Sequence, residues 1–414
     1  MWIPVGGGKN LLFDTDEKRK GAILKSVTLP ARRNLIKKGF GVLAWAGLAR
    51  LGPVAASPSV KQEITPVRKA MKIICLEEHY LDRDLGQAFM PAALEQAPYL
   101  IDWGKNVVDG NNADRSRPQI EKNMLINQKG TDLESRRLRD MDEAGITMQI
   151  LSVGGFPQLA SGDDAVTLNK AANDRLAEAV NNHPDRFAAF ATLPWAQPKE
   201  AEKELVRTIE ELGFKGALLN GRPSSCFLDH PDYDSLLSRF NKLNVPLYLH
   251  PGLPFKSVQQ AYFTGFSAEV NARLSMFGWG WHHEAGIHLL RLMLSGAFDK
   301  YPHLQVISGH WGEMLPFWLQ RLDDSLPLAA TGLSRTLTRT FQEHVYVTPS
   351  GMLTLSHFRF IYELMGAERI LFSVDYPYQT LDGVKTFIDS LPVNKAEKEA
   401  IAFRNATRLL GITV

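Results

Sequence analysis

The sequence predicts an α/β protein organised as a (β/α)8 TIM barrel, with an N-terminal signal-like segment in front of it. From Met71 onward, eight short apolar or β-branched runs alternate with eight amphipathic stretches, as expected for parallel strands joined by helices. No Gly-x-Gly-x-x-Gly sequence follows the first run, which disfavours a doubly wound dinucleotide-binding sheet. A closed barrel therefore explains the alternation best.

Each predicted strand is followed by a predicted helix. The strands are expected at 72–76, 147–151, 187–192, 216–219, 246–249, 305–308, 345–347 and 370–372. The helices are expected at 132–144, 166–182, 198–212, 232–243, 284–294, 313–324, 354–364 and 381–391, and a last helix at 395–410 would brace the barrel. The connections 80–131 and 251–283 are too long for simple turns. In a barrel both lie over the C-terminal face, where active sites are built.

The first 70 residues differ from the rest of the chain in charge. They carry 13 basic and four acidic residues, whereas the remainder carries 34 basic and 41 acidic ones, so the formal charge of +2 averages two unlike parts. The mildly acidic body argues against a nucleic-acid partner, since phosphate binding needs clustered Lys and Arg. With only Cys75 and Cys226, the chain can form neither a disulfide scaffold nor a cysteine-rich zinc module.

The leader has the order of an export signal. Arg32 and Arg33 precede an apolar run at 39–49, and small residues extend to Ala56, which resembles a twin-arginine signal read by the twin-arginine export machinery. The predicted parts are a signal peptide, a linker and a catalytic domain, over 1–56, 57–70 and 71–414. We expect a periplasmic protein with no permanent membrane span, because the apolar run is shorter than the ~20 residues that cross a bilayer. The alternatives are a basic surface helix, or a true start at Met71 and a cytoplasmic protein.

Metal-binding residue types gather where the predicted strands end. Glu77 and His79 follow the first strand, His250 the fifth, His310 the sixth and Asp375 the eighth. These strand ends meet at one face of a barrel, and residues two apart on an extended segment point the same way, so Glu77 and His79 can face one ion while the residue between them turns outward. Two imidazoles and two carboxylates suit a divalent cation. The alternative is a set of histidines that only hydrogen-bond at the rim.

The motifs around these residues resemble those of a known family. In order along the body, they are Leu76-Glu77-Glu78-His79, His183-Pro184-Asp185-Arg186-Phe187, Leu249-His250-Pro251, Gly309-His310-Trp311-Gly312-Glu313 and Ser373-Val374-Asp375-Tyr376-Pro377. The set resembles the amidohydrolase-related metal-dependent decarboxylases, the group that contains γ-resorcylate and 2,3-dihydroxybenzoate decarboxylases. The first motif is Glu-x-His, where hydrolytic relatives usually carry His-x-His, and this is similar to the benzoate decarboxylase branch.

The resemblance implies a barrel of the metal-dependent hydrolase type and assigns roles to its residues. The implied ligands of one divalent ion, zinc first and manganese or magnesium as alternatives, are Glu77, His79, His250 and Asp375. His310 is implied to orient a water or the substrate, and Glu313 to hold His310. Arg321 aligns with an arginine that binds the carboxylate substrate in relatives, sometimes from a neighbouring subunit. Relatives are commonly dimers or tetramers, so we expect a homodimer or homotetramer.

Other side chains have two interpretations each. Trp279 and Trp281 could stack on an aromatic substrate or could serve loop packing or a dimer contact. Asn220, at the end of the fourth predicted strand, could bind substrate in the pocket or cap a turn. His282 and His283 are expected to be exposed loop histidines.

Three functions are compatible with these residues. The first is a metal-dependent, non-oxidative decarboxylase (a carboxy-lyase) of a hydroxylated aromatic or related unsaturated carboxylic acid, in which Asp375 protonates the carbon that loses CO2 and His310 holds its geometry. The second is a hydrolase of a lactone or ester, in which the metal activates water and Asp375 or His310 is the general base. The third is a non-catalytic binding protein, which the intact ligand set disfavours.

Overall fold

The computed structural model describes residues 71–101, 109, 113–162 and 164–414. The predicted signal peptide and linker, including Arg32 and Arg33, lie outside the described residues. Within the described part of the chain, no helix is long and apolar enough to cross a membrane.

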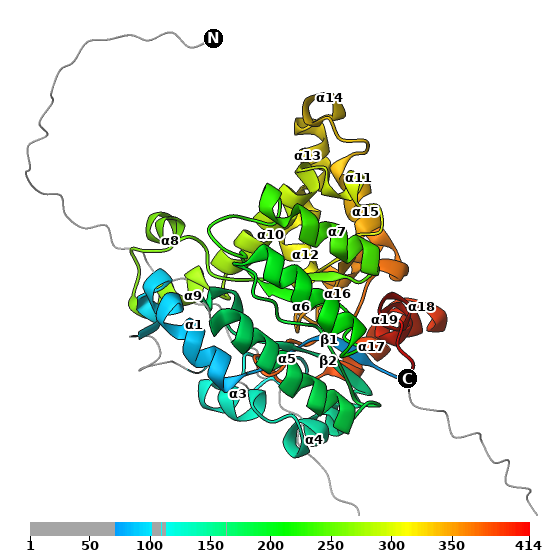
Figure 1. The fold of residues 1–414 in the computed structure, drawn as a ribbon. Helices are drawn as coiled ribbons and strands as arrows, with labels where there is room; N and C mark the ends of the chain where they lie inside the picture. The colour runs from blue at the N-terminus through cyan, green and yellow to red at the C-terminus, as the bar shows by residue number, and fades with distance from the viewer. Residues whose placement is uncertain (1–70, 102–108, 110–112, 163) are drawn as a thin grey trace, which may run out of the picture. The chain divides into compact units, whose positions relative to one another are not determined.

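Among the described residues, seven parallel strands form the centre of the body (Figure 1). They are β1 (Ile74–Tyr80), β2 (Met148–Val153), β3 (Phe187–Ala189), β4 (Ala217–Asn220), β5 (Leu247–His250), β6 (Val306–Ser308) and β7 (Val345–Val347). Hydrogen-bonded pairing runs in chain order through β1-β2-β3 and through β4-β5-β6-β7. A parallel bridge between Ala191 and Ala217 joins the two sheets. The strand order confirms the predicted parallel α/β arrangement.

The eighth predicted strand is not a regular strand, although its segment closes the barrel. Ile370 forms a parallel bridge to Val347, and the amide of Leu76 in β1 donates to the carbonyl of Phe372 at 3.0 Å. Beyond this point the side chain of Glu78 accepts from the amides of Val374 and Tyr376, at 2.9 and 3.3 Å. Beyond the bridge, this segment is therefore tied to β1 partly by the side chain of Glu78.

Apolar side chains pack on both sides of the barrel wall. Ile74 and Leu76 of β1 belong to a cluster inside the barrel with Tyr248 and Ile307, whereas Cys75 and Leu249 pack against the surrounding helices. This double burial explains why the strands appear in the sequence as continuous apolar runs. The inner layer ends at Glu77 and His79. The sequence places these two residues after the first strand, but in the structure they lie within β1.

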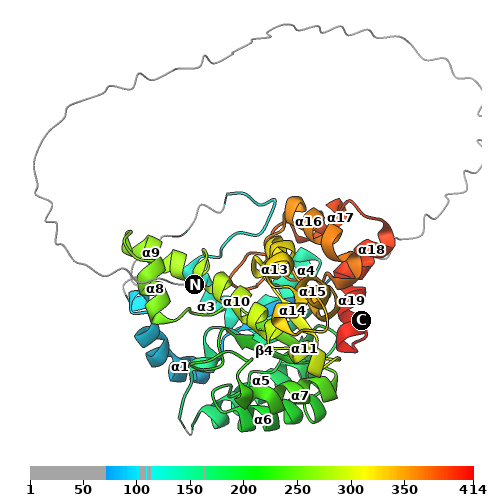
Figure 2. The same cartoon turned by 90° about the horizontal axis from the view of Figure 1, so that it is seen from above.

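Helices cover the strands, and α5, α6 and α7 lie side by side in both views (Figures 1 and 2). The helices are α1 (Arg83–Gln96), α3 (Asn123–Gly130), α4 (Ser135–Ala144), α5 (Asp164–Asn182), α6 (Pro198–Glu210), α7 (Asp234–Leu243), α8 (Lys256–Tyr262), α9 (Ala268–Ser275), α10 (Gly280–Leu294), α11 (Ala297–Lys300), α12 (His310–Glu313), α13 (Leu319–Ser325), α14 (Leu328–Thr331), α15 (Leu337–His344), α16 (Leu355–Met365), α17 (Val384–Ser390), α18 (Lys395–Glu399) and α19 (Asn405–Leu410).

Three helix predictions need correction. The helix expected at 313–324 forms only from Leu319, because Glu313 and Met314 have φ of 52° and 66°, a left-handed conformation that cannot continue an α-helix. The helix α15 is absent from the prediction, although its inner face is buried. The last predicted helix is interrupted by a π-helical turn at Ala400–Arg404 between α18 and α19.

The two long connections fold into helices. The first contains α1 and α3, and the second contains α8, α9 and the start of α10. Ala97, Leu253, Ala272 and Met276 pack together and join the two connections. The second connection therefore brings the first turn of α10 to the C-terminal end of the barrel.

Candidate metal centre and active site

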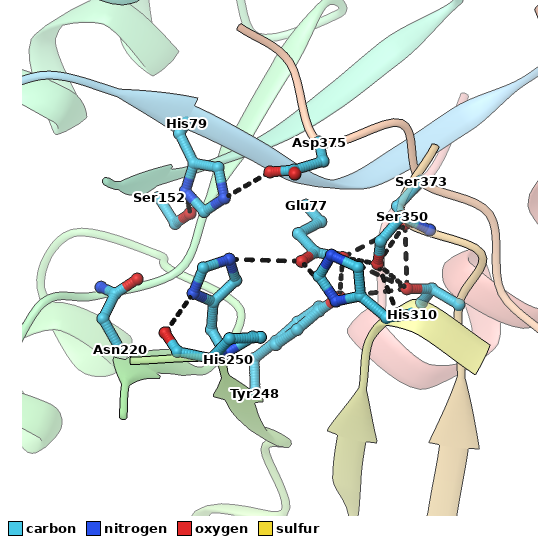
Figure 3. A network of polar contacts seen from close by, with 12 residues as sticks. Glu77, His79, Ser152, Asn220, Tyr248, His250, His310, Ser350, Ser373 and Asp375 are labelled. Atoms are coloured by element: carbon cyan, nitrogen blue, oxygen red, sulfur yellow. Dashed lines mark hydrogen bonds and ion pairs between the residues drawn. The ribbon is translucent and has the colours of Figure 1, made fainter. Parts of the chain in front are cut away.

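Four ligand-type side chains meet at the C-terminal end of the barrel (Figure 3). Glu77 and His79 come from β1, His250 is the last residue of β5, and Asp375 follows the segment that closes the barrel. One ligand atom from each of the four lies within 4.8 Å of the others. Nε2 of His79 is 3.2 Å from Oδ1 of Asp375, and Nε2 of His250 is 3.3 Å from Oε1 of Glu77. The structure thus brings together the four residues that the sequence predicts as one set.

The hydrogen bonds of these side chains fit a metal ion. Oε1 of Glu77, Nε2 of His79 and Oδ1 of Asp375 are buried and have no hydrogen-bond partner among the described residues. The opposite nitrogens of the two histidines are engaged: Nδ1 of His79 contacts Oγ of Ser152 at 3.1 Å, and Nδ1 of His250 contacts the carbonyl of Pro251 at 2.9 Å. Buried polar atoms normally have partners, and a hydrogen bond on one imidazole nitrogen directs the other to a metal. The residues present therefore fit one divalent cation.

Hydroxyl groups hold the second oxygen of Glu77. Tyr248 of β5 donates to Oε2 at 2.5 Å, and Ser350 also donates to it. Thr348 and Ser373 lie 3.4 Å from the same oxygen. The sequence analysis did not identify these residues, although Tyr248 lies two positions before His250 and so shares its face of the strand. The hydroxyl set fixes the Glu77 rotamer and leaves Oε1 for the ion.

Burial controls the pKa values of the ligand set. It lowers the pKa of His79 to about 4 and that of His250 well below its usual value, so both imidazoles are neutral, the form that binds metal. It raises the pKa of Glu77, and it raises the pKa of Asp375 to about 7 against the opposing charges of His310 and His282. Burial thus favours the protonated form of the Glu77 and Asp375 carboxyls. A bound cation would favour their ionised form instead.

The sequence predicts that Glu78, between Glu77 and His79, turns outward. In the structure Glu78 is buried instead. The pairing of β1 with β2 shifts register between Cys75 and Glu78, which marks a β-bulge. The Glu78 carboxyl accepts from Gln149 at 3.1 Å as well as from the two amides described above. Burial raises its pKa to about 8. Glu78 is therefore a buried connector between β1 and the segment that carries Asp375.

A second cluster of histidine and carboxylate lies beside the first. Nδ1 of His310 is 2.7 Å from Oε1 of Glu313, and Nδ1 of His282 is 2.9 Å from Oε2 of the same carboxylate. The contact between His310 and Glu313 is the one implied by the resemblance. Burial lowers the pKa of His310, but the charges of Glu313, Glu77 and Asp375 and the hydrogen bond to Glu313 together raise it to about 10. His282 is not an exposed loop residue as expected, since its side chain is 16% exposed and sits in the first turn of α10.

The remaining predicted site residues are distributed differently. Asn220 pairs with His250 across β4 and β5 and is buried beside it (Figure 3), with its amide donating to the carbonyl of Val153 and its Oδ1 without a hydrogen-bond partner among the described residues. Its side chain therefore lies next to the metal-ligand candidate His250. Trp279 is half exposed, and Trp281 packs on Phe277 and donates to His282. Arg321 is exposed on α13 and contacts none of the metal-ligand candidates.

The family model for amidohydrolases matches residues 129–412 of the chain. The protein therefore belongs to the amidohydrolase family. A decarboxylase from Emericella nidulans is 33% identical over 352 residues, which span 82% of this chain and 97% of the relative. The γ-resorcylate decarboxylase of a Polaromonas species is 36% identical over 313 residues, which span 72% of this chain and 92% of the relative.

Solved structures of similar proteins agree with this assignment. The 2,6-dihydroxybenzoate decarboxylase in complex with 2,6-dihydroxybenzoate has a TM-score of 0.68 at 30% identity, covering 83% of this chain and all of the other. The 5-carboxyvanillate decarboxylase of Novosphingobium aromaticivorans, complexed with manganese and 4-hydroxy-3-methoxy-5-nitrobenzoic acid, has a TM-score of 0.72 at 30% identity, covering 83% of this chain and 96% of the other. This chain is a metal-dependent decarboxylase, and the expectation of a carboxy-lyase is confirmed.

Proposed function

We propose that the protein removes CO2, without redox change, from an aromatic acid that carries a hydroxyl group next to the carboxylate. The observation that carries the proposal is the convergence of three buried ligand atoms that lack hydrogen-bond partners, one each from Glu77, His79 and Asp375. A bound divalent ion supplies orientation and charge stabilisation for a carboxylate and an adjacent hydroxyl. The substrate named for these relatives, γ-resorcylate, which is 2,6-dihydroxybenzoate, has this arrangement.

Asp375 is the proposed proton donor to the ring carbon that loses CO2. Its side chain is 12% exposed, whereas that of Glu77 is fully buried, so of these two carboxyls Asp375 is the one that can reach the substrate side. Nε2 of His310 makes no hydrogen bond to any described residue, and its Nδ1 is held by Glu313. His310 can therefore orient the substrate while Asp375 transfers the proton.

Two neutral imidazoles and two carboxylates accept either zinc or manganese. Zinc is the expectation from the sequence, and manganese is the metal named in solved structures of the 5-carboxyvanillate and dihydroxybenzoic acid decarboxylases. Elemental analysis of the purified protein, together with reconstitution by each ion in turn, identifies the resident metal.

The test of the proposed substrate class is an assay of CO2 release from a panel of hydroxybenzoic acids. We expect turnover of acids with a hydroxyl next to the carboxylate and none of 3- or 4-hydroxybenzoic acid, because only the former can bind through two adjacent oxygens. Lactones serve as the control for the hydrolase alternative. Acid release from a lactone, with no CO2 from any benzoic acid after metal addition, would overturn the proposal.

We propose that Arg321 acts in the active site of a second copy of the chain. Arg321 forms no ion pair or hydrogen bond within the described residues, and it follows Phe317 and Trp318, whose exposed fractions are 62% and 61%. Such an apolar surface is typical of a subunit interface. Mixing inactive Arg321→Ala and Asp375→Asn chains should restore part of the activity in a hetero-oligomer. A monomer in size-exclusion chromatography with light scattering would contradict this.

We propose that residues 1–56 direct export through the twin-arginine machinery to the periplasm. The paired arginines, the short apolar run and the small residues that follow support this proposal. N-terminal sequencing of protein from the periplasmic fraction should show cleavage after Ala56, and Arg32→Lys/Arg33→Lys should abolish export. Full-length protein confined to the cytoplasm would contradict it.

A further inference from the structure

His282 occupies a place in the active site to which none of the expected roles applies. Its imidazole binds Oε2 of Glu313 through Nδ1, at 2.9 Å. Its other nitrogen, Nε2, lies 3.1 Å from the indole nitrogen of Trp281 and 3.0 Å from the carbonyl of Phe277. The ring is 4.4 Å from the ring of His310, centre to centre. His282 is therefore fixed on all sides by groups of the second long connection and of the segment after β6.

The carboxylate of Glu313 depends on the two histidines alone. Its side chain is 1% exposed, each oxygen contacts one imidazole nitrogen, and no Lys or Arg of the described residues forms an ion pair with it. A buried carboxylate needs hydrogen bonds to both oxygens to remain charged and in one rotamer. His282 supplies half of that requirement. If His282 is removed, Glu313 keeps only its bond to His310 and is free to rotate.

The backbone at His310 makes this support important. His310 has a φ of 46° and begins the left-handed run that ends at Met314, and this conformation is costly for residues other than glycine. The regular rows of helix contacts that normally fix a side chain are absent there. Instead, Nδ1 of His310 is held by Glu313, and its backbone amide donates to Oγ of Ser350 at 2.9 Å. The orientation of His310 thus depends on Glu313, and through it on His282.

The surroundings of Nε2 allow His282 to keep this bond in two protonation states. In the neutral form with hydrogen on Nδ1, Nε2 accepts from the indole of Trp281. In the cationic form, Nε2 donates to the carbonyl of Phe277. In both forms Nδ1 donates to Glu313. The contact with Glu313 is therefore independent of the charge of His282.

We propose that His282 is a positioning residue of the decarboxylase, which acts through Glu313 to orient His310 toward the substrate. The inference rests on the proposed function, in which His310 faces the reacting acid. It deepens that function by adding His282 to the pair of His310 and Glu313, which the family resemblance implies. His282 forms no hydrogen bond or ion pair with a metal-ligand candidate among the described residues, so its hold on the geometry of His310 passes through the Glu313 carboxylate.

The test compares three variants of the full-length, metal-loaded protein. His282→Leu removes the hydrogen-bond donor and replaces the imidazole by an apolar side chain of similar size. His282→Asn places an amide N–H close to the position of Nδ1. His283→Leu changes the next residue of α10, whose side chain forms no hydrogen bond or ion pair among the described residues, and is the matched control.

We expect His282→Leu to lower kcat by about 10- to 100-fold, the range for residues that support an active-site group, with KM, metal content and melting temperature unchanged. His282→Asn should recover most of kcat, and His283→Leu should match the parent protein. In a Glu313→Gln background, His282→Leu should have no additional effect. Equal losses in the Leu and Asn variants, or a full additional loss in the Glu313→Gln background, would overturn the proposal.

A spectroscopic measurement separates this inference from the substrate proposal. The hydrogen-bonded Nδ1 proton of His310 should give a downfield NMR resonance in protein loaded with diamagnetic zinc, and His282→Leu should shift it while His283→Leu should not. An unchanged resonance in His282→Leu would reject the positioning role whatever the substrate is. Failure of the parent protein to release CO2 from any hydroxybenzoic acid would reject only the substrate class.

Discussion

Two clusters of histidine and carboxylate lie next to each other at the C-terminal end of the barrel, and they differ in whether their polar atoms are satisfied. In the ligand cluster, made of Glu77, His79, His250 and Asp375, three buried ligand atoms have no hydrogen-bond partner among the described residues. In the support cluster, made of His282, Glu313 and His310, each carboxylate oxygen is paired with an imidazole nitrogen. Similar residue types thus form two different kinds of site.

The difference indicates what kind of positive charge can balance the carboxylates of each cluster. The ligand atoms of this cluster lie within 4.8 Å of one another, and a divalent cation would satisfy two carboxylates and two neutral imidazoles at once. In the support cluster each Glu313 oxygen already has an imidazole partner, so a proton on His310 can balance the carboxylate without a metal. Proximity of His, Asp and Glu is therefore weak support for a metal site unless the ligand atoms also lack other partners.

Metal removal should have the largest effect and should act on the ligand cluster alone. Dialysis against a chelator is expected to abolish CO2 release, because the substrate then loses its binding point. It should also lower the melting temperature, since an ion at 100 times its Kd stabilises the fold by about 2.7 kcal/mol. Activity assays and calorimetry before and after addition of zinc or manganese check this. Full activity in protein shown to be metal-free would refute the assignment of the two clusters.

Asp375→Asn should lower kcat by about 10²- to 10⁴-fold, the usual contribution of a positioned proton donor. The amide keeps the shape of the side chain but cannot deliver a proton. Metal content must be measured in parallel, because Asp375 is also a ligand candidate. A loss of activity that extra metal fully restores would show that Asp375 binds the ion only and that another group donates the proton.

Glu313→Gln should cost less than Asp375→Asn, about 10- to 100-fold in kcat, and should leave the metal content at the level of the parent protein. The matched variant in the ligand cluster, Glu77→Gln, should instead lose the ion, because it removes a charged ligand atom. Elemental analysis of both variants is the measurement. Metal loss in Glu313→Gln would mean that the support cluster also holds an ion.

The pH dependence of stability should be the smallest effect and should differ with and without metal. Burial raises the pKa of Asp375 from 3.8 to about 7 in the ion-free site. A raised carboxyl pKa favours the folded state when the group is protonated, so this contribution is present below about pH 4 and is lost as the pH rises toward 7. Stabilisation by metal should therefore grow over the same interval, since binding needs the ionised carboxylate. Melting temperatures with chelator and with metal from pH 5 to 8 check this, and Asp375→Asn should flatten the difference.

Much of the barrel could be predicted from periodicity, and the failures have specific causes. The apolar runs located seven strands, because strands buried on both faces appear as continuous apolar segments. The eighth segment has the same appearance but forms only a single bridge to β7 and an isolated backbone hydrogen bond to β1. The helix expected at 313–324 forms as α-helix only from Leu319, because Glu313 and Met314 at its start adopt left-handed φ values, which no hydrophobic pattern reveals.

The sequence by itself determined the ligand cluster, because parallel strands in a barrel bring their C-terminal ends together whatever the details of packing. Glu77, His79, His250 and Asp375 could thus be grouped from strand positions alone. Only the tertiary structure decided the positions of Tyr248 against Glu77, of buried Glu78, and of His282 beside Glu313. These contacts depend on a β-bulge, on the depth of each strand and on the folding of the second long connection. Such features arise from packing between residues far apart in the chain, which local patterns do not encode.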